Sequence, residues 1–440
     1  MQIWSQALKV AAQTPPQRNR YVDFLRAVSI LVVIFGHWLT TTAYYVDGVL
    51  TAGHLFRIQP WTQWLTWMFQ VMPVFFIVGG YSNAVSLDSA KRKHVTYAAW
   101  LAGRLHRLVI PLLLLLLFWI LLAAGLGVLG VEPARLQLAS QVALIPTWFL
   151  AIYIMVVVLA PLMYRFWRHL GFVSFWILAV LAVSTDLAYF AAGLRWPAWC
   201  NYFWVWLAIH MLGFAWRDGR CGGTGRLLLW SALGLSALWI LVHFGPYPLA
   251  MVGSPGQEVS NNTPPKVTLL ALAVFQFGLL LAFERPMRVV LEDLRFWAAT
   301  VLINGMIMSI YLWHATVNVI FVALLYLTGA AGLGFEPGTA AWWWSRLPWL
   351  LVLTCLLLPV AQLVAPLERN ARDPAITVRS PGWQIVGAMM TGLGIALLAM
   401  FGYGGGSGSG LAAFALVVGG AAVGGLLPRL RSWSKRDDPP

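Results

Sequence analysis

Long apolar runs separated by short polar segments dominate the pattern along the chain. The run "VIPLLLLLLFWILLAAGLGVLG" (residues 109–130) is apolar on every face, and similar runs recur from Val28 to Leu427. A bilayer core about 30 Å thick needs about 20 apolar residues per helix. A membrane β-barrel is excluded, because its strands alternate apolar and polar residues. The pattern therefore predicts an all-α, polytopic transmembrane helical bundle.

About twelve spans fit this pattern, with ends defined to within several residues. No soluble domain is predicted. We divide the chain into a membrane-embedded domain at residues 1–380 and a Gly-rich transmembrane hairpin with a basic tail at residues 381–440. Gly420 and Gly424 in this hairpin form a small-xxx-small pattern that suits close helix contact. The predicted spans are residues 28–46, 66–87, 108–130, 148–164, 172–192, 199–216, 227–244, 266–283, 297–328, 347–366, 383–403 and 410–428.

Composition and charge agree with a membrane protein. Of the 440 residues 60% are hydrophobic and only 10% are charged, against roughly 25% charged in a soluble domain. The net charge of +14 reflects topology and not a nucleic-acid partner, because the basic residues segregate to alternate loops, and the positive-inside rule then places both termini in the cytoplasm. Three scattered cysteines predict neither a disulfide framework nor a metal site. The five basic residues on the other side are Arg57, Arg135, Arg195, Lys266 and Arg346.

The first span carries two ionisable residues on one stripe. Arg26 and His37 are eleven residues apart, which is close to three full turns and about 16 Å along a helix. Arg26 then lies at the cytoplasmic boundary, where Asp23 can pair with it, and His37 lies near the middle of the membrane. Arg26 can also be read as a snorkelling anchor. A histidine at this depth normally faces a polar cavity, although a neighbouring carbonyl can also satisfy it.

Further polar residues lie inside predicted spans. Four of them share one face of the ninth span, which favours a cavity wall over simple interhelical hydrogen bonding. Asp186 in the fifth span has three open roles: orienting His37, pairing with an arginine, or closing a structural network. Tyr81 follows the pair Gly79-Gly80, where a substrate or another helix can approach. His54 falls in a predicted loop and is expected to be solvated. The residues on the face are Asn304, Tyr311, His314 and Asn318.

Five segments carry a resemblance to a known family. "RYVDFLRAVSILVVIFGH" resembles the first-helix signature of the acyltransferase 3 family of integral membrane O-acyltransferases, a basic residue followed after ten residues by histidine. In the same order along the chain, "PVFFIVGGYSNA", "RLHRLVIP", "TWFL" and "YLWHATV" are similar to later family segments. The chain departs from the family in having Gly79-Gly80 where many members have Ser-Gly, no glutamate after Trp-Phe-Leu, and about two more spans than the usual ten.

The resemblance implies transfer of an acyl group, usually acetyl, from cytoplasmic acyl-CoA to a hydroxyl of an envelope glycan, glycolipid or small molecule. A polyanionic donor needs a basic mouth, which Arg26, Arg104 and Arg107 can supply, because guanidinium groups bind phosphate oxygens bidentately. His37 is the expected general base, with a covalent acyl-histidine as the variant. His314 is expected to bind the acceptor or handle protons. No metal is expected, a homodimer stays open, and the expected location is the bacterial inner membrane.

A transporter or flippase for a lipid-linked sugar or related solute is the alternative function. Such proteins also place polar groups near the membrane midplane. The sequence shows no repeat between its halves, and the similar segments all belong to the acyltransferase pattern. A transporter predicts that a His37→Ala protein still moves its substrate and transfers no acyl group.

Overall fold

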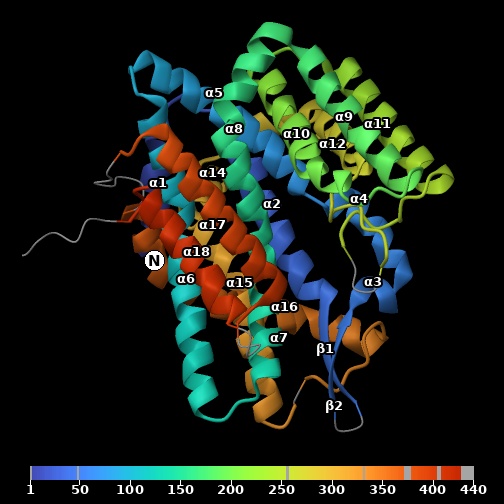
Figure 1. Cartoon of the computed structure of the whole chain (residues 1–440), viewed down its shortest axis with the longest axis vertical. Helices are drawn as coiled ribbons and strands as arrows, with labels where there is room; N and C mark the ends of the chain where they lie inside the picture. Colours follow the sequence, from blue (N-terminus) through green and yellow to red (C-terminus); the bar gives the residue numbers. More distant parts are fainter. Residues whose placement is uncertain are drawn as a thin grey trace, which may run out of the picture.

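The structure is a computed structural model, and it describes residues 2–427 apart from 47–48, 254–256, 331, 371–377 and 404–407. Figure 1 shows helices packed along the long axis of the molecule, with a β-hairpin at the end away from the turn after α5. The elements are α1 (Gln2–Ala12), α2 (Arg20–Thr40), β1 (Thr41–Val46), β2 (Val49–His54), α3 (Leu55–Ile58), η1 (Pro60–Leu65), α4 (Thr66–Phe69), α5 (Met72–Arg92), α6 (Tyr97–Val128), α7 (Pro133–Leu144), η2 (Ile145–Thr147), α8 (Trp148–Leu170), α9 (Phe172–Phe190), η3 (Pro197–Cys200), α10 (Asn201–Arg217), α11 (Thr224–Phe244), α12 (Val267–Ala282), α13 (Glu284–Val290), α14 (Leu294–Gly305), α15 (Ile307–Leu327), α16 (Ala340–Asn370), α17 (Pro381–Phe401) and α18 (Ser409–Val423).

The helical bundle is confirmed, and each predicted span overlaps at least one helix. Within the described ranges, nine segments are long and apolar enough to cross a membrane, or ten if α12 and α13, which meet at a bend of 51°, form one broken span. The helices α10 and α18 are shorter, with 17 and 15 residues. The count of twelve spans and the orientation of the termini stay predictions, and the basic tail beyond residue 427 lies outside the described residues.

The predicted first span is wrong at both ends. Its helix, α2, covers Arg20–Thr40, and the next residues turn into β1. β1 pairs antiparallel with β2, with Thr41 opposite His54 and Val46 opposite Val49. The bundle therefore carries a β-ribbon that the all-α prediction left out. His37 consequently lies in the last turn of α2, nearer the helix end than the predicted mid-membrane position.

The predicted ninth span is also interrupted. α14 ends at Gly305 and α15 begins at Ile307, with Met306 between them outside helical geometry. Asn304 therefore lies on a different helix from Tyr311, His314 and Asn318. We expected these four residues on one helix face, but only Tyr311, His314 and Asn318 share one.

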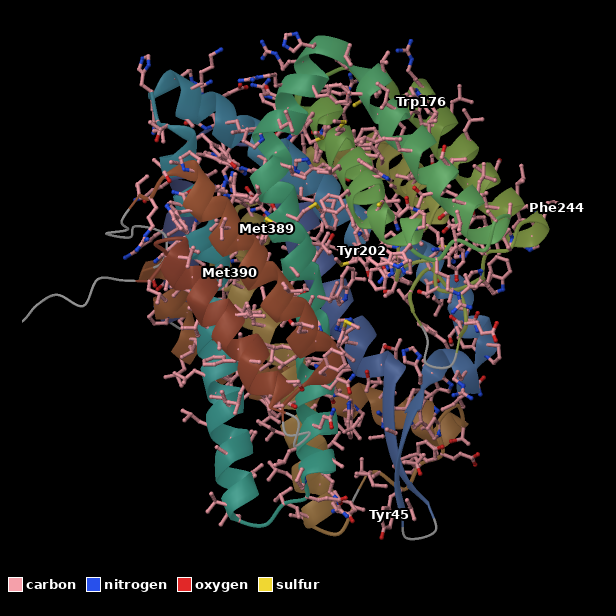
Figure 2. All side chains as sticks on the ribbon, in the orientation of Figure 1. Tyr45, Trp176, Tyr202, Phe244, Met389 and Met390 are labelled. Carbon is pink, nitrogen blue, oxygen red and sulfur yellow. The ribbon has the colours of Figure 1, made fainter. Side chains whose placement is uncertain are left out.

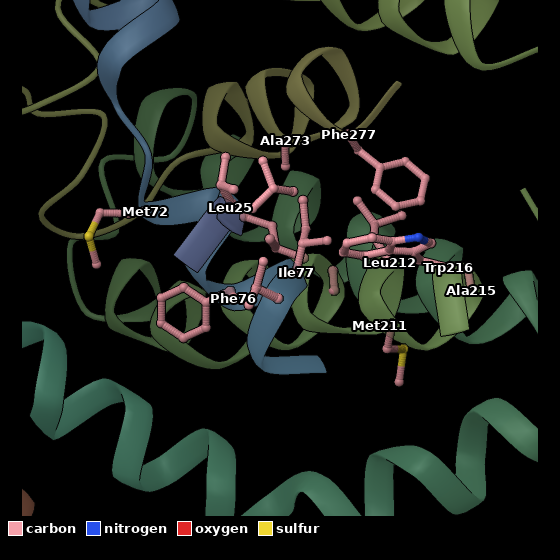
Figure 3. Packing of buried hydrophobic residues seen from close by; sticks show 14 of the residues in the cluster. Leu25, Met72, Phe76, Ile77, Met211, Leu212, Ala215, Trp216, Ala273 and Phe277 are labelled. Atoms are coloured by element: carbon pink, nitrogen blue, oxygen red, sulfur yellow. The ribbon is translucent and has the colours of Figure 1, made fainter. Parts of the chain in front are cut away.

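Two hydrophobic clusters form the core, and α2 and α8 contribute to both. Figure 3 shows part of the first cluster, where Phe76 and Ile77 of α5 pack among residues of α2, α10 and α12. Gly80 of α5 and Gly213 of α10 make this contact close: a Cβ on Gly80 would lie 2.0 Å from the His210 carbonyl oxygen. Large side chains such as Trp176 and Phe244, 60% and 83% exposed, project from the rim of the bundle (Figure 2), as expected for a surface that faces lipid.

The C-terminal hairpin packs on the bundle through α17, which lies against α8 and α7. Its two helices meet through glycines. A Cβ on Gly387 would lie 2.5 Å from the Gly420 carbonyl oxygen and 2.6 Å from the Gly424 nitrogen. The close helix contact expected at Gly420 and Gly424 is therefore present.

Candidate active site

The first turn of α2 holds a compact group of charges. Asn19 caps the helix, and its side chain accepts a hydrogen bond from the Tyr21 N–H at 3.1 Å. The two carboxylate oxygens of Asp23 accept from two arginines, Arg18 Nε at 2.6 Å and Arg26 Nη1 at 3.1 Å. The expected Asp23–Arg26 ion pair is thus present, and it fixes the direction of the Arg26 guanidinium.

Ser82 of α5 connects two of the predicted donor-binding arginines. Arg26 Nη2 donates to Ser82 Oγ at 2.8 Å, and Arg104 Nη2 donates to the Ser82 carbonyl at 3.3 Å. The Arg104 guanidinium also lies over the Trp100 ring, 5.6 Å from its centroid. Ser82 was not among the predicted site residues, although it lies two residues after the Gly79-Gly80 pair.

A cavity of about 920 Å³ opens beside these arginines. Its walls come from α1, α2, α5, α6, α8, α14, α15 and α16. Among the described residues that line it, four are arginines and Asp23 is the one acid, so the cavity has an excess of positive charge. The predicted spans left out α1, whose residues line part of the cavity. The lining arginines are Arg18, Arg26, Arg104 and Arg107.

Ile30 of α2 and Tyr311 of α15 line the cavity, and on these two helices they are the lining residues nearest in sequence to the histidines. His314 is one helical turn beyond Tyr311, and His37 is about two turns, or about 10 Å, beyond Ile30. Neither histidine lines the cavity. The Tyr311 hydroxyl donates to the Pro146 carbonyl of η2, which holds the ring in place. Along α15, Tyr311 is therefore the last lining residue before His314.

The structure brings His37 and His314 together from helices 277 residues apart in sequence. His37 Nδ1 lies 2.9 Å from His314 Nε2, and the two rings stack with centroids 5.1 Å apart. His314 is fully buried, whereas His37 keeps part of its surface accessible. Trp38 holds the two helices together here, because its indole N–H donates to the His314 carbonyl at 3.0 Å.

One backbone carbonyl fixes the protons of this pair. His314 Nδ1 is hydrogen-bonded to the Tyr311 carbonyl, which can only accept, so Nδ1 carries the hydrogen. In a neutral imidazole the other nitrogen is then an acceptor, so His314 Nε2 accepts from His37 Nδ1. His37 Nε2 is left with a lone pair. The pair thus presents His37 Nε2 as a base, and His314 can stabilise the His37 imidazolium that forms when this base takes a proton.

The other predicted substrate-binding residues are spread over three places. Asn304 lines the cavity and donates to the Asp23 carbonyl at 2.9 Å. Tyr81 lies beside Trp216, with ring centroids 4.8 Å apart, and does not line the cavity. Asn318 is one turn beyond His314 on α15, and its Oδ1 is buried without a hydrogen-bond partner.

Asp186, one of the predicted catalytic residues, has hydrogen-bond partners other than the histidine pair. Its carboxylate accepts from Asn201 Nδ2 at 2.9 Å, from the Tyr247 hydroxyl at 3.1 Å and from the Val267 N–H at 2.9 Å. These bonds join α9 to α10 and to the start of α12. Of its three open roles, the structural network is the one that the structure supports.

His54 is a residue whose position the sequence did not predict. The hairpin register places it opposite Thr41, next to the end of α2, and its Nδ1 is buried without a partner. It lies close enough to His37 for the two imidazoles to repel each other when charged. Burial lowers the pKa of His54 to about 4, so this side chain is neutral near pH 7.

Residues 19–365 match the acyltransferase 3 family, described as an acyltransferase domain. This match covers more than three quarters of the chain, and the chain belongs to that family. It is a membrane acyltransferase of multi-pass topology. No curated protein and no solved structure matches the chain.

Proposed function

We propose that the protein is a membrane O-acyltransferase that moves an acyl group, acetyl in the simplest case, from cytoplasmic acyl-CoA to a hydroxyl of an envelope glycan, glycolipid or small molecule. The observation that carries this proposal is the His37–His314 pair, whose hydrogen bonds leave His37 Nε2 as a free base. Family membership supports acyl transfer in general. The location we propose is the bacterial inner membrane.

The donor site is the arginine cavity. Arg26, Arg104 and Arg107 meet there, and guanidinium groups suit the phosphates of coenzyme A. Arg26 and Arg104 are held through Ser82, so their guanidinium groups are positioned before the donor arrives. The acylated end of the donor passes Tyr311 to reach His37.

The proposed transfer step involves the His37–His314 pair, the thioester donor and the acceptor hydroxyl. His37 Nε2 takes the proton of the acceptor hydroxyl while the hydroxyl oxygen attacks the thioester carbonyl carbon. The carbon–sulfur bond breaks, the new ester forms, and the departing thiolate takes the proton back from His37. His314 keeps its hydrogen on Nδ1 throughout, bound to the Tyr311 carbonyl. In the covalent variant His37 Nε2 attacks the thioester carbonyl carbon, the carbon–sulfur bond breaks and the thiolate leaves. The acceptor hydroxyl oxygen then attacks the acyl carbon, the carbon–nitrogen bond breaks, and the hydroxyl proton passes to the thiolate.

The test compares His37→Ala with wild type and with His169→Ala, an exposed histidine that serves as a matched control. Membranes receive isotope-labelled acetyl-CoA, and release of free thiol and label in envelope lipids and glycans are measured. We expect both signals to disappear in His37→Ala and to persist in His169→Ala. Transfer at the wild-type rate by His37→Ala would reject the proposal. Rapid acid quenching followed by peptide mass spectrometry separates the two mechanisms, because only the covalent one leaves an acetyl group on His37.

A further inference from the structure

Arg346 differs from the other basic residues on the predicted outer side of the membrane. It lies near the start of α16 and is only 5% exposed. Among the described residues, no carboxylate lies within ion-pair distance of its guanidinium. The other four basic residues on the predicted outer side are exposed or lie near an acid. Arg57 and Arg195 are exposed, Arg135 lies beside Glu132, and Lys266 lies near Asp186.

Two indole rings, which donate hydrogen bonds but do not accept them, pack against Arg346. Its guanidinium carbon lies over two indoles, 4.6 Å from the Trp342 ring centroid and 4.5 Å from that of Trp349. The spacing of these three residues places them on one face of α16. Within the described part of the chain, the indole N–H of each tryptophan is buried and has no hydrogen-bond partner. Among the same residues, Arg346 donates only to the neighbouring Ser345 hydroxyl, from Nε at 3.3 Å and Nη2 at 3.1 Å.

Arginine and tryptophan side chains carry donors and no acceptors, so these three residues cannot satisfy one another. The cation–π contacts offset part of the cost of burying the charge of Arg346, but they leave the indole N–H groups of the two tryptophans unpaired. An oxygen-rich anion supplies what is missing, namely a negative charge and several acceptors. We propose that Arg346, Trp342 and Trp349 form a binding site for an oxyanion, which is a phosphate or carboxylate group.

The position of this anion site indicates which of the two substrates binds there. Trp349 contacts Phe321 of α15, with ring centroids 4.9 Å apart, and Phe321 is two turns beyond His314 on the same helix. The site therefore lies on the far side of the histidine pair from the arginine cavity. Taken together with the proposed function, on which this step rests, the acceptor is a hydroxyl compound that also carries an anionic group, such as a lipid-linked sugar phosphate or an acidic sugar.

The experiment measures anion binding without acyl transfer. Thermal unfolding of the full-length protein in nonionic detergent is followed against increasing inorganic phosphate. A second arm uses nanodiscs of phosphatidylcholine with or without phosphatidylglycerol. Wild type is compared with Arg346→Gln and with the control Arg195→Gln, an exposed outer arginine. The cytoplasmic arginines are the same in all three proteins, so their phosphate binding cancels in the comparison.

We expect wild type and Arg195→Gln to be stabilised in at least one arm, and Arg346→Gln to need at least tenfold more anion for the same shift. Stabilisation by soluble phosphate identifies a free oxyanion, and stabilisation only by phosphatidylglycerol identifies a lipid headgroup. An unchanged response in Arg346→Gln, or no response of wild type in either arm, overturns the proposal. Should Arg346→Gln not fold, Trp342→Phe and Trp349→Phe replace it, since they keep an aromatic ring beside the guanidinium and remove the indole N–H.

The result is separable from the fate of the proposed function. His37→Ala leaves the Arg346 cluster untouched, so it should keep the anion response even though it transfers no acyl group. An active His37→Ala protein with an intact anion response would reject the acyltransferase mechanism and leave the anion site standing. An inactive His37→Ala protein without any Arg346-dependent anion response would leave the acyltransferase mechanism standing and reject the anion site.

Discussion

At the scale of single residues, the proposed chemistry depends on which nitrogen of each imidazole carries a hydrogen. The Tyr311 carbonyl sets this for His314, and His314 sets it for His37. The sequence predicted that His37 and His314 lie on polar faces of their spans, but it could not predict that they touch. Their contact depends on how α2 and α15 are packed, and residues 277 positions apart carry no local signal of that packing.

Removing His37, the proposed base, should lower kcat far more than removing His314. We expect His37→Ala to lower kcat about 100- to 10,000-fold, the usual contribution of a general base. His314→Ala should lower kcat by less, because water can accept from His37 Nδ1 in its place. His314 is a positioning residue, so the readout is the pH profile of kcat, whose acidic limb should move in His314→Ala. A profile identical to wild type would argue that His314 only fills space.

The cavity arginines should act on donor binding. Arg104→Gln should raise KM for acyl-CoA about tenfold with a smaller effect on kcat, because a charge-assisted contact to phosphate is worth about 1.5–3 kcal/mol. Arg92→Gln, an exposed residue at the end of α5, is the control and should leave KM unchanged. Equal KM values for wild type and Arg104→Gln would remove Arg104 from the donor site.

His54 should make stability depend on pH. Its folded pKa of about 4 lies below its ordinary value of about 6.5, so protonation favours the unfolded state. Its contribution is complete above about pH 6.5 and is lost as the pH falls toward about 4. Thermal unfolding of His54→Gln should therefore lose less stability over this interval than wild type, whereas His169→Gln should follow wild type. Parallel curves for His54→Gln and wild type would show that His54 is solvated.

At the scale of the elements, apolar runs predicted where the helices are, and they failed where an element is short or partly polar. The apolar pattern places part of Thr41–His54 in a membrane span, because this segment follows an apolar run without a break. Its Asp47-Gly48 dipeptide, flanked by Thr, Tyr and Val, is a hairpin signal that hydropathy does not detect. The interruption at Met306 could not be read from the sequence, since Gly305 is tolerated inside many helices.

The α5–α10 contact should be sensitive to a single methyl group. Gly80→Ala would place a Cβ 2.0 Å from the His210 carbonyl, so the helices must separate, and overpacking of this kind costs about 1–3 kcal/mol. Gly103→Ala on α6 is the control, since its Cβ would meet nothing within 4 Å. Thermal unfolding in detergent should show a clearly lower midpoint for Gly80→Ala alone. Equal midpoints would mean that the two helices are not in close contact.

At the scale of the whole molecule, the charge pattern predicts which end faces the cytoplasm. The turn after α5, at Arg92, and the β-hairpin lie at opposite ends (Figure 1), as the alternation of basic loops requires. The arginine cavity and the Arg346 cluster then belong to opposite sides. The predicted orientation places the proposed donor site on the cytoplasmic side and the proposed anion site on the outer side.

Labelling of single cysteines tests the orientation. In a background without the three native cysteines, Lys93→Cys lies in the exposed turn after α5 and Val128→Cys at the far end of α6. A maleimide that cannot cross membranes should label Val128→Cys in spheroplasts and Lys93→Cys only in inside-out vesicles. The opposite pattern would reverse the topology and place the arginine cavity outside.

Tyr311 contributes to both regions: its ring lines the arginine cavity, and its backbone carbonyl accepts the hydrogen bond from His314 Nδ1. The ring and the carbonyl can move independently, because rotation about χ1 swings the ring and leaves the backbone where it is. In the proposed reaction, such a rotation breaks the bond from the Tyr311 hydroxyl to the Pro146 carbonyl and lets the thioester pass, while the hydrogen positions on His314 and His37 stay as they are. A slide of the whole of α15 would open the same passage but would break the contact between His314 and His37, so rotation of one side chain is the smaller movement.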